Sequence, residues 1–206
     1  MQIRFKVSLT GEQYVSQQGW LKASLTCCPL HPQGGCGFAR HGTYPRRSPP
    51  GVLIARWYCP LAHRTVSLLP DYLASRLPGT LDEAEQVVLA VEQAPSLAAA
   101  ADRLRPDIEL PGAIRWVRRR VKAVRSILHR VRGLLPEPLA PWPATVQAFR
   151  GALGLSRVLV PMREMAAPWL SALPPPLGFA PPAGHGGEAQ RRFQQSMGPD
   201  PPAPMA

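Results

Sequence analysis

The sequence predicts an α+β protein with a small β module at the front, a mainly helical module behind it and a Pro-rich tail. Three observations support this prediction. Apolar and polar residues alternate near the start, apolar residues recur at helical spacing from Thr80 onward, and nine of the 26 prolines fall after residue 173. The predicted segments are a β module over 1–78, a basic helical module over 79–135, packing helices over 136–173 and a disordered tail over 174–206.

The β module begins with a half-buried strand. Ile3, Phe5, Val7 and Leu9 alternate with polar residues until Gly11, which is the period of a strand with one buried face. Two further apolar pieces, 52–58 and 65–69, are separated by Pro and Gly and predict more strands. All four cysteines lie between residues 27 and 59. A module with so little apolar core is expected to need a cross-link such as a disulfide or a bound metal ion.

Helix signals begin at Thr80. Thr80 and Glu83 form a capping box, in which each side chain satisfies a backbone amide at the start of a helix. Ser96 is placed to cap a second helix, which Pro106 must end. A third helix is expected to open at Pro111, since proline is tolerated in a first turn, and to run toward Leu135 before the next prolines.

The third helix carries an apolar residue at alternating steps of three and four, and these positions form a heptad stripe: Ile114, Val117, Val121, Val124, Leu128, Val131 and Leu135. This spacing is compatible with a homodimer through the third helix. The flanking heptad positions, however, hold several arginines and no acidic residue, so a parallel homodimer would face like charges across its seam. We therefore favour packing of the stripe on the protein's own helices.

Cysteine and histidine spacing predicts a metal centre. Cys28 and Cys36 lie in one Gly-rich loop, and Cys59 and His63 lie in another after a strand-like stretch. Two ligand pairs on two turns, separated by strands, are typical of a zinc ribbon, in which four protein donors surround a structural Zn²⁺. The first loop is longer than usual, and Gly34-Gly35 would let it fold back so that Cys36 points inward.

Other assignments of these residues stay open. His31, separated from Cys28 by two residues, could replace Cys36 as a ligand, and Cys27 could replace Cys28. A reduced-thiol core without metal is the plain structural alternative. A nucleophilic pair of Cys36 or Cys59 with His41 or His63 lacks a third group to orient the base and a recognisable oxyanion turn, so we do not expect an enzyme.

Charge points to a polyanionic partner. The formal net charge is +11, with 24 Lys and Arg against 13 Asp and Glu, and nucleic acid is the commonest polyanion. Basic residues crowd the third helix, as they do in the recognition helix of helix-turn-helix domains. The predicted nucleic-acid-binding residues are Arg115, Arg118, Arg119, Arg120, Lys122 and Arg125. Trp116 is expected to be a packing anchor.

The order of motifs resembles a known module. The runs are Cys28 to Cys36, Arg40-His41-Gly42-Thr43-Tyr44-Pro45-Arg46, Arg56-Trp57-Tyr58-Cys59 and His63-Arg64-Thr65-Val66-Ser67-Leu68-Leu69-Pro70. Over about residues 25–130 this order resembles the zinc ribbon and helix-turn-helix at the front of bacterial transposase-like and transposon-associated proteins. The resemblance implies ligands at Cys28, Cys36, Cys59 and His63 and a DNA-reading third helix. Ala62 stands where the family has its last cysteine.

These observations predict a non-catalytic DNA-binding protein with a structural zinc, whose partner is double-stranded DNA. The alternative is a zinc-ribbon scaffold for protein or RNA partners. After residue 135 the acidic residues are too few to suggest a transposase nuclease domain, which holds two metal ions. No charged leader with an apolar run begins the chain, so we expect a soluble, cytoplasmic protein with no membrane contact.

Overall fold

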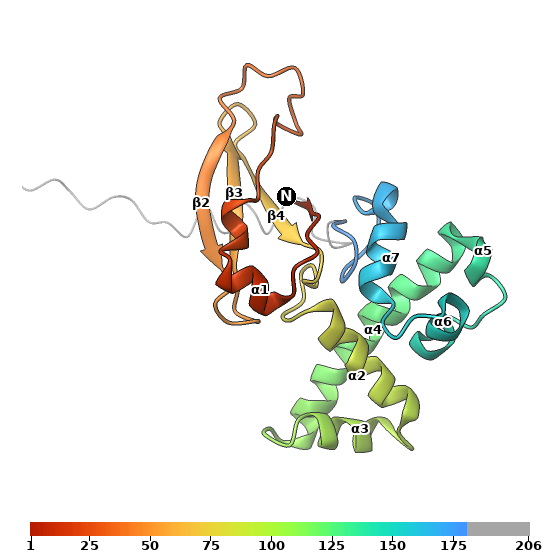
Figure 1. Ribbon diagram of the computed structural model, residues 1–206. Helices are drawn as coiled ribbons and strands as arrows, with labels where there is room; N and C mark the ends of the chain where they lie inside the picture. The colour runs from red at the N-terminus through yellow and green to blue at the C-terminus, as the bar shows by residue number, and fades with distance from the viewer. Residues whose placement is uncertain (181–206) are drawn as a thin grey trace, which may run out of the picture.

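The computed structural model describes residues 1–180, and most of the predicted disordered tail, 181–206, lies outside the described residues. Figure 1 shows a β-sheet standing beside a group of helices, with α2, α3 and α4 at one end of the molecule and the loop before β2 at the other. The α+β class is therefore confirmed. Within residues 1–180, no helix combines the length and the apolar character that a membrane span requires.

The sheet has four strands in the order β1-β4-β3-β2. Their bounds are Gln2–Phe5 for β1, Ala39–Pro45 for β2, Leu53–Cys59 for β3 and Arg64–Pro70 for β4. β1 pairs with β4 in parallel, whereas β4 with β3 and β3 with β2 are antiparallel. The two apolar pieces expected to be strands are β3 and β4. β2 was not expected, because it contains Gly42 and Pro45 and its side chains are mostly exposed.

The first strand is shorter than expected. It ends at Phe5, and a short helix, α1 (Gly11–Ser16), follows. Thr10 and Gln13 form a capping box at its start, a signal of the same kind as the one found at Thr80. A 3₁₀ turn, η1 (Gly19–Leu21), then leads into the cysteine loop.

The three helices of the basic module lie where the sequence placed them: α2 is Leu81–Gln93, α3 is Leu97–Leu104 and α4 is Leu110–Leu134. Thr80 and Glu83 form the expected capping box, and the Ser96 hydroxyl accepts a hydrogen bond from the Ala99 amide. The three helices pack on one another. The apolar stripe of α4 is buried within the chain, from Val117 through Val131, so it packs on the protein's own core. A homodimer through this helix stays a prediction.

The shorter C-terminal helices are anchored to α2 by two carboxylates. These helices are α5 (Pro136–Leu139), α6 (Val146–Leu153), α7 (Leu159–Met165) and the 3₁₀ turn η2 (Ala167–Trp169). Glu92 accepts hydrogen bonds from two amides at the start of α6, each at 3.0 Å. Glu85 is fully buried and accepts from the amides of Val158 and Leu159, which begin α7, and from Arg150.

One hydrophobic core joins the sheet to the helices. Buried residues run without a break from Tyr14 and Ile54 in the β module to Phe149 and Phe179 near the end of the described chain. Residues 174–180, assigned to the tail by their prolines, instead pack on this core. The buried guanidinium of Arg163 holds them, because it donates to the carbonyls of Pro176 and Leu177 on one side and of Asp71 and Leu73 on the other.

Candidate metal centre and basic helix face

Four potential metal ligands meet at the end of the sheet that lies farthest from α3 (Figure 1). They are Cys28, His31 and Cys36 from the loop before β2, and Cys59 at the end of β3. Their ligand atoms all lie within 4.8 Å of one another. The three cysteines are buried and free, and His31 is half-buried. The sequence thus placed three of these residues correctly in one cluster.

The loop folds back on itself because of its turns and glycines. The His31 amide donates to the Cys28 carbonyl at 3.2 Å, which closes a tight turn between these two ligands. Gly34 and Gly35 have φ values of +85° and +75°, a region that residues with a Cβ rarely adopt. The chain can therefore reverse within a few residues, and Cys36 points back toward Cys28, as the sequence led us to expect.

Two of the distances between donor atoms are close to those in a tetrahedral zinc site. The Nδ1 atom of His31 lies 3.7 Å from the Sγ atom of Cys28 and 3.3 Å from that of Cys59. Zinc with ordinary bond lengths to sulfur and nitrogen would place such a pair roughly 3.6 Å apart. The donor set, three thiols and one imidazole, is also one that zinc commonly takes in structural sites.

The surroundings of Cys28 favour the thiolate that a metal needs, whereas burial raises the pKa of the Cys36 thiol. Burial raises the pKa of Cys28. Hydrogen bonds from the His31 side chain and from the backbone amides of Leu30 and His31 outweigh this effect and lower that pKa to about 7. The amide of Ala62 points at the Sγ atom of Cys59 from 3.4 Å. Both features stabilise negative charge on sulfur.

His63, expected as the fourth ligand, lies outside the cluster. Residues 60–63 form a tight turn between β3 and β4, closed by a hydrogen bond from the His63 amide to the Pro60 carbonyl at 3.3 Å. His63 adopts a left-handed conformation there, with φ of 49°. Its Nδ1 atom lies 3.3 Å from the hydroxyl of Tyr58 instead of near the thiols. His31 is the fourth member of the cluster, although the sequence offered it in place of Cys36, which also belongs to the cluster. Cys27 is exposed.

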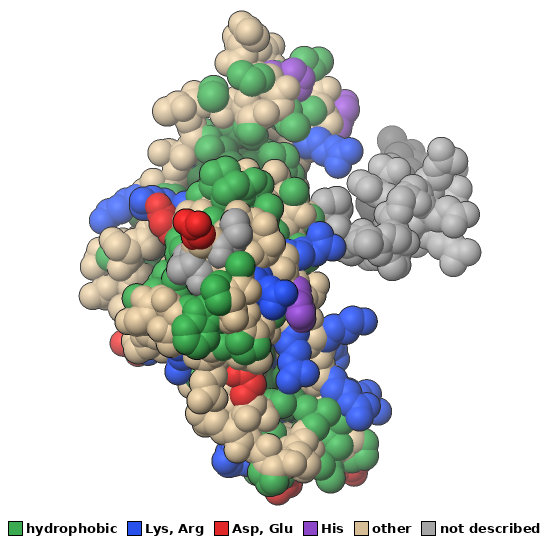
Figure 2. Space-filling view, turned by 90° about the vertical axis from the view of Figure 1, so that its right-hand side faces the viewer, with side chains coloured by type: hydrophobic (Ala, Val, Ile, Leu, Met, Phe, Trp, Pro, Cys, Tyr) green, Lys and Arg blue, Asp and Glu red, His purple; other side chains and the backbone are tan. Residues whose placement is uncertain are grey.

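A second feature is the exposed face of α4, which we call the basic face. It comprises Arg115, Arg118, Arg119, Lys122, Arg125, His129 and Arg130. These residues recur at helical spacing on the side opposite the buried stripe, and none of the exposed residues between them is acidic. In Figure 2 blue side chains gather along one side of the lower half of the molecule. Five of the six predicted nucleic-acid-binding residues lie on this face.

Arg120, the sixth predicted residue, points elsewhere. It is half-buried, with its guanidinium carbon 3.8 Å from the centre of the Trp116 ring. Arg105 lies 5.0 Å from the same ring. Trp116 is therefore a packing anchor for two arginines. Sequence reasoning missed His129, although its spacing of four residues from Arg125 would have placed it on the basic face.

Comparison with known proteins gives no relative: no family model, no curated protein and no solved structure matches the chain. The resemblance to transposase-associated modules therefore rests on the motifs within about residues 25–130.

Proposed function

We propose that this chain is a non-catalytic nucleic-acid-binding protein that contacts double-stranded DNA through the basic face and is stabilised by a structural zinc ion. The basic face carries this proposal. The resemblance to transposase-associated modules favours DNA over RNA, and an α-helix of 25 residues has the shape that a major groove admits.

The charge on the basic face is unfavourable without a partner. Arg115 and Arg119 are four residues apart on one helix, and so are Arg118 and Lys122. Like charges at this spacing destabilise a helix by a few tenths of a kcal/mol per pair. Within residues 1–180, the ion pairs involve none of these basic side chains. A row of phosphates would relieve the repulsion.

The length of the basic face also suits a duplex. From Arg115 to Arg130 the helix rises about 22 Å. The phosphates of one DNA strand recur every few ångströms along such a distance, so several could be contacted together. Because the opposite face of α4 is buried in the core, the basic face is the long exposed side of the helix.

Zinc would act on folding in this proposal. Cys28, His31, Cys36 and Cys59 would supply four protein donors, and a site with four protein ligands has no open position for water or substrate. The bound ion would tie the cysteine loop to the end of β3. The basic face lies on the bundle at the other end of the molecule (Figure 1), so the ion would not touch the DNA ligand.

The test is the salt dependence of duplex binding. We expect the wild-type protein to bind a 20-base-pair duplex with a Kd of roughly 1–100 µM near physiological salt, and to lose affinity steeply as salt rises. Changing Arg115 and Lys122 together to Ala should reduce the slope of log K against log salt by about two. The matched control changes Lys22 and Arg64 to Ala, which are exposed, equally charged and outside the basic face.

Two results would contradict the proposal. The first is no salt-dependent binding of the duplex by the folded wild-type protein. The second is an equal loss of slope in the Lys22 and Arg64 control, which would mean that net charge, and not the basic face, governs binding. A parallel titration with duplex RNA separates the two nucleic acids, and tighter binding of RNA would overturn the choice of DNA.

A further inference from the structure

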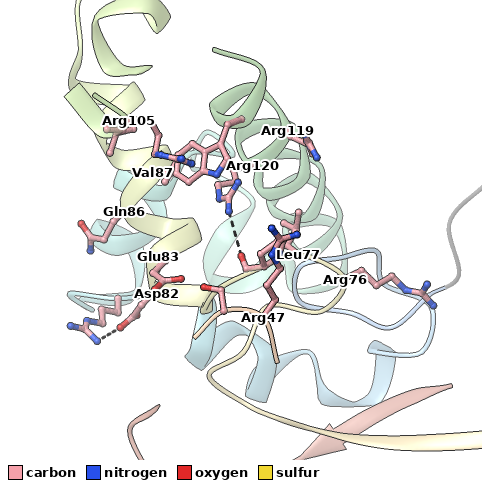
Figure 3. Close-up of a pocket in the computed structure, with 15 residues that line it drawn as sticks. Arg47, Arg76, Leu77, Asp82, Glu83, Gln86, Val87, Arg105, Arg119 and Arg120 are labelled. Carbon is pink, nitrogen blue, oxygen red and sulfur yellow. Dashed lines mark hydrogen bonds and ion pairs between the residues drawn. The ribbon is translucent and has the colours of Figure 1, made fainter. Parts of the chain in front are cut away.

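A cavity of about 960 Å³ lies beside α4, between the basic helices and the β module. Its wall is formed by the connection between β2 and β3, the turn before α2, and one side of α4 (Figure 3). Its lining contains six arginines and only two carboxylates. The arginines are Arg47, Arg76, Arg105, Arg119, Arg120 and Arg157.

Both carboxylates already have partners. Asp82 forms an ion pair with Arg157. Glu83 accepts a hydrogen bond from the Thr80 amide at 2.8 Å, which is its part in the capping box. Arg105 is paired with Asp107 just outside the cavity, at 2.7 Å. The acidic groups near the cavity are therefore committed to these contacts.

The remaining arginines are left with uncompensated charge. Among the described residues, Arg47, Arg76 and Arg119 take part in no ion pair, and all three are exposed. In Figure 3 the side chains of Arg47 and Arg120 reach the region of Leu77, the first from the β2–β3 connection and the second from α4. Arginines from two separate parts of the chain thus converge on one hollow.

The positive charge of Arg120 is also poorly compensated. Its contact with the Pro78 carbonyl is long, at 3.5 Å. Burial lowers the pKa of Arg120, and the neighbouring guanidinium groups of Arg105 and Arg119 lower it further. The Glu83 carboxylate opposes this effect only in part, since the pKa of Arg120 stays lowered. A half-buried cation beside two like charges is stabilised when an anion enters.

We propose that this cavity binds phosphate groups of the nucleic-acid backbone, held by Arg47 and Arg76 from the β module and by Arg119 and Arg120 from α4. The guanidinium fork suits phosphate because it can donate two parallel hydrogen bonds. Arg119 belongs both to the basic face and to the cavity, so one strand could pass from the helix onto the β module. This inference rests on the proposed function, because that function supplies nucleic acid as the ligand.

The experiment changes Arg47 and Arg76 together to Ala and measures the salt slope of duplex binding. Neither residue lies on α4, so the basic face stays intact. We expect the slope to fall by about two, with weaker binding at every salt concentration. The control is again Lys22 and Arg64 changed to Ala, and the melting temperature of each variant verifies that the fold is kept.

The outcomes separate the cavity from the basic face. An unchanged slope in the Arg47 and Arg76 variant, with a reduced slope in the Arg115 and Lys122 variant, would overturn the cavity proposal and leave the proposed function standing. Absence of duplex binding by the wild-type protein would overturn both the proposed function and the cavity proposal. A titration with pyrophosphate covers the other source of phosphate. Saturable binding of pyrophosphate that needs Arg47 and Arg76, without duplex binding, would assign the cavity to a small phosphoanion and overturn the backbone assignment.

Discussion

Exchange of His31 for Asn should weaken zinc binding far more than exchange of His63 for Asn. The two histidines differ in position: the Nδ1 atom of His31 lies 3.3 Å from the Cys59 sulfur, whereas that of His63 faces the Tyr58 hydroxyl. Asn is a suitable replacement at residue 63, because it tolerates the left-handed conformation found there.

The magnitude follows from the number of donors. Structural zinc sites of this type bind with an apparent free energy of about 10–16 kcal/mol at pH 7. Shared among four donors, this is about 2.5–4 kcal/mol each, so loss of one ligand should weaken affinity roughly 10²- to 10³-fold. The Tyr58 contact of His63 is made outside the cluster, so the His63 variant should stay within about threefold of wild type.

The assay is competition for zinc with a chromophoric chelator at pH 7, on protein purified under reducing conditions without chelator. Metal content by mass spectrometry provides the stoichiometry, expected near one per chain. Loss of affinity in the His63→Asn variant with retention in His31→Asn would refute the geometric argument and restore the ligand set read from spacing. A wild-type protein without affinity for zinc would remove the metal centre altogether.

Three further predictions concern the scaffold. Arg163→Met should lower the free energy of unfolding by about 3 kcal/mol, because several buried carbonyls lose their donor. The melting temperature should fall by roughly 6–12 °C. The control Arg157→Met, at an exposed ion pair, should lower the free energy of unfolding by less than about 1 kcal/mol. Glu85→Gln should lower the free energy of unfolding, measured by urea denaturation, by about 2–3 kcal/mol. Glu92→Gln should lower it by about 1 kcal/mol. Equal effects of the two variants would contradict the prediction. Hydrogen bonds from Lys6, and then Arg4, lower the pKa of Glu164, so its contribution to stability is present above its ordinary pKa and lost as the pH falls through the lowered value. Glu164→Gln should flatten the acid side of a melting-temperature profile, and an unchanged profile would count against the ion pair.

Signals that act within a few residues were readable from the sequence. The capping box at Thr80, the Ser96 cap and the proline that ends α3 each depend on neighbours a few residues away. The apolar stripe of α4 was readable for the same reason, since one helix sets its own periodicity. These signals placed α2, α3 and α4 to within about one or two residues.

Features set by distant contacts were not readable in the same way. β2 is a strand because β3 lies beside it, and its own residues include Gly42 and Pro45. The fourth ligand depends on how two loops meet in space, and spacing alone could not choose between His31 and His63. Residues 174–180 looked like a disordered tail because their prolines predict one, but Arg163 supplies buried donors for their carbonyls.

The parallel pairing of β1 with β4 determines the order in which the sheet can form. Gln2 lies opposite Ser67, and Phe5 lies opposite Pro70, so the first residues of the chain have no strand partner until some sixty more have been synthesised. Closing so long a loop costs conformational entropy before β1 and β4 make any stabilising contact. α2, α3 and α4 are neighbours along the chain, so their contacts need only short loops to close. We therefore expect the helices to fold early and the N-terminal strand to dock last.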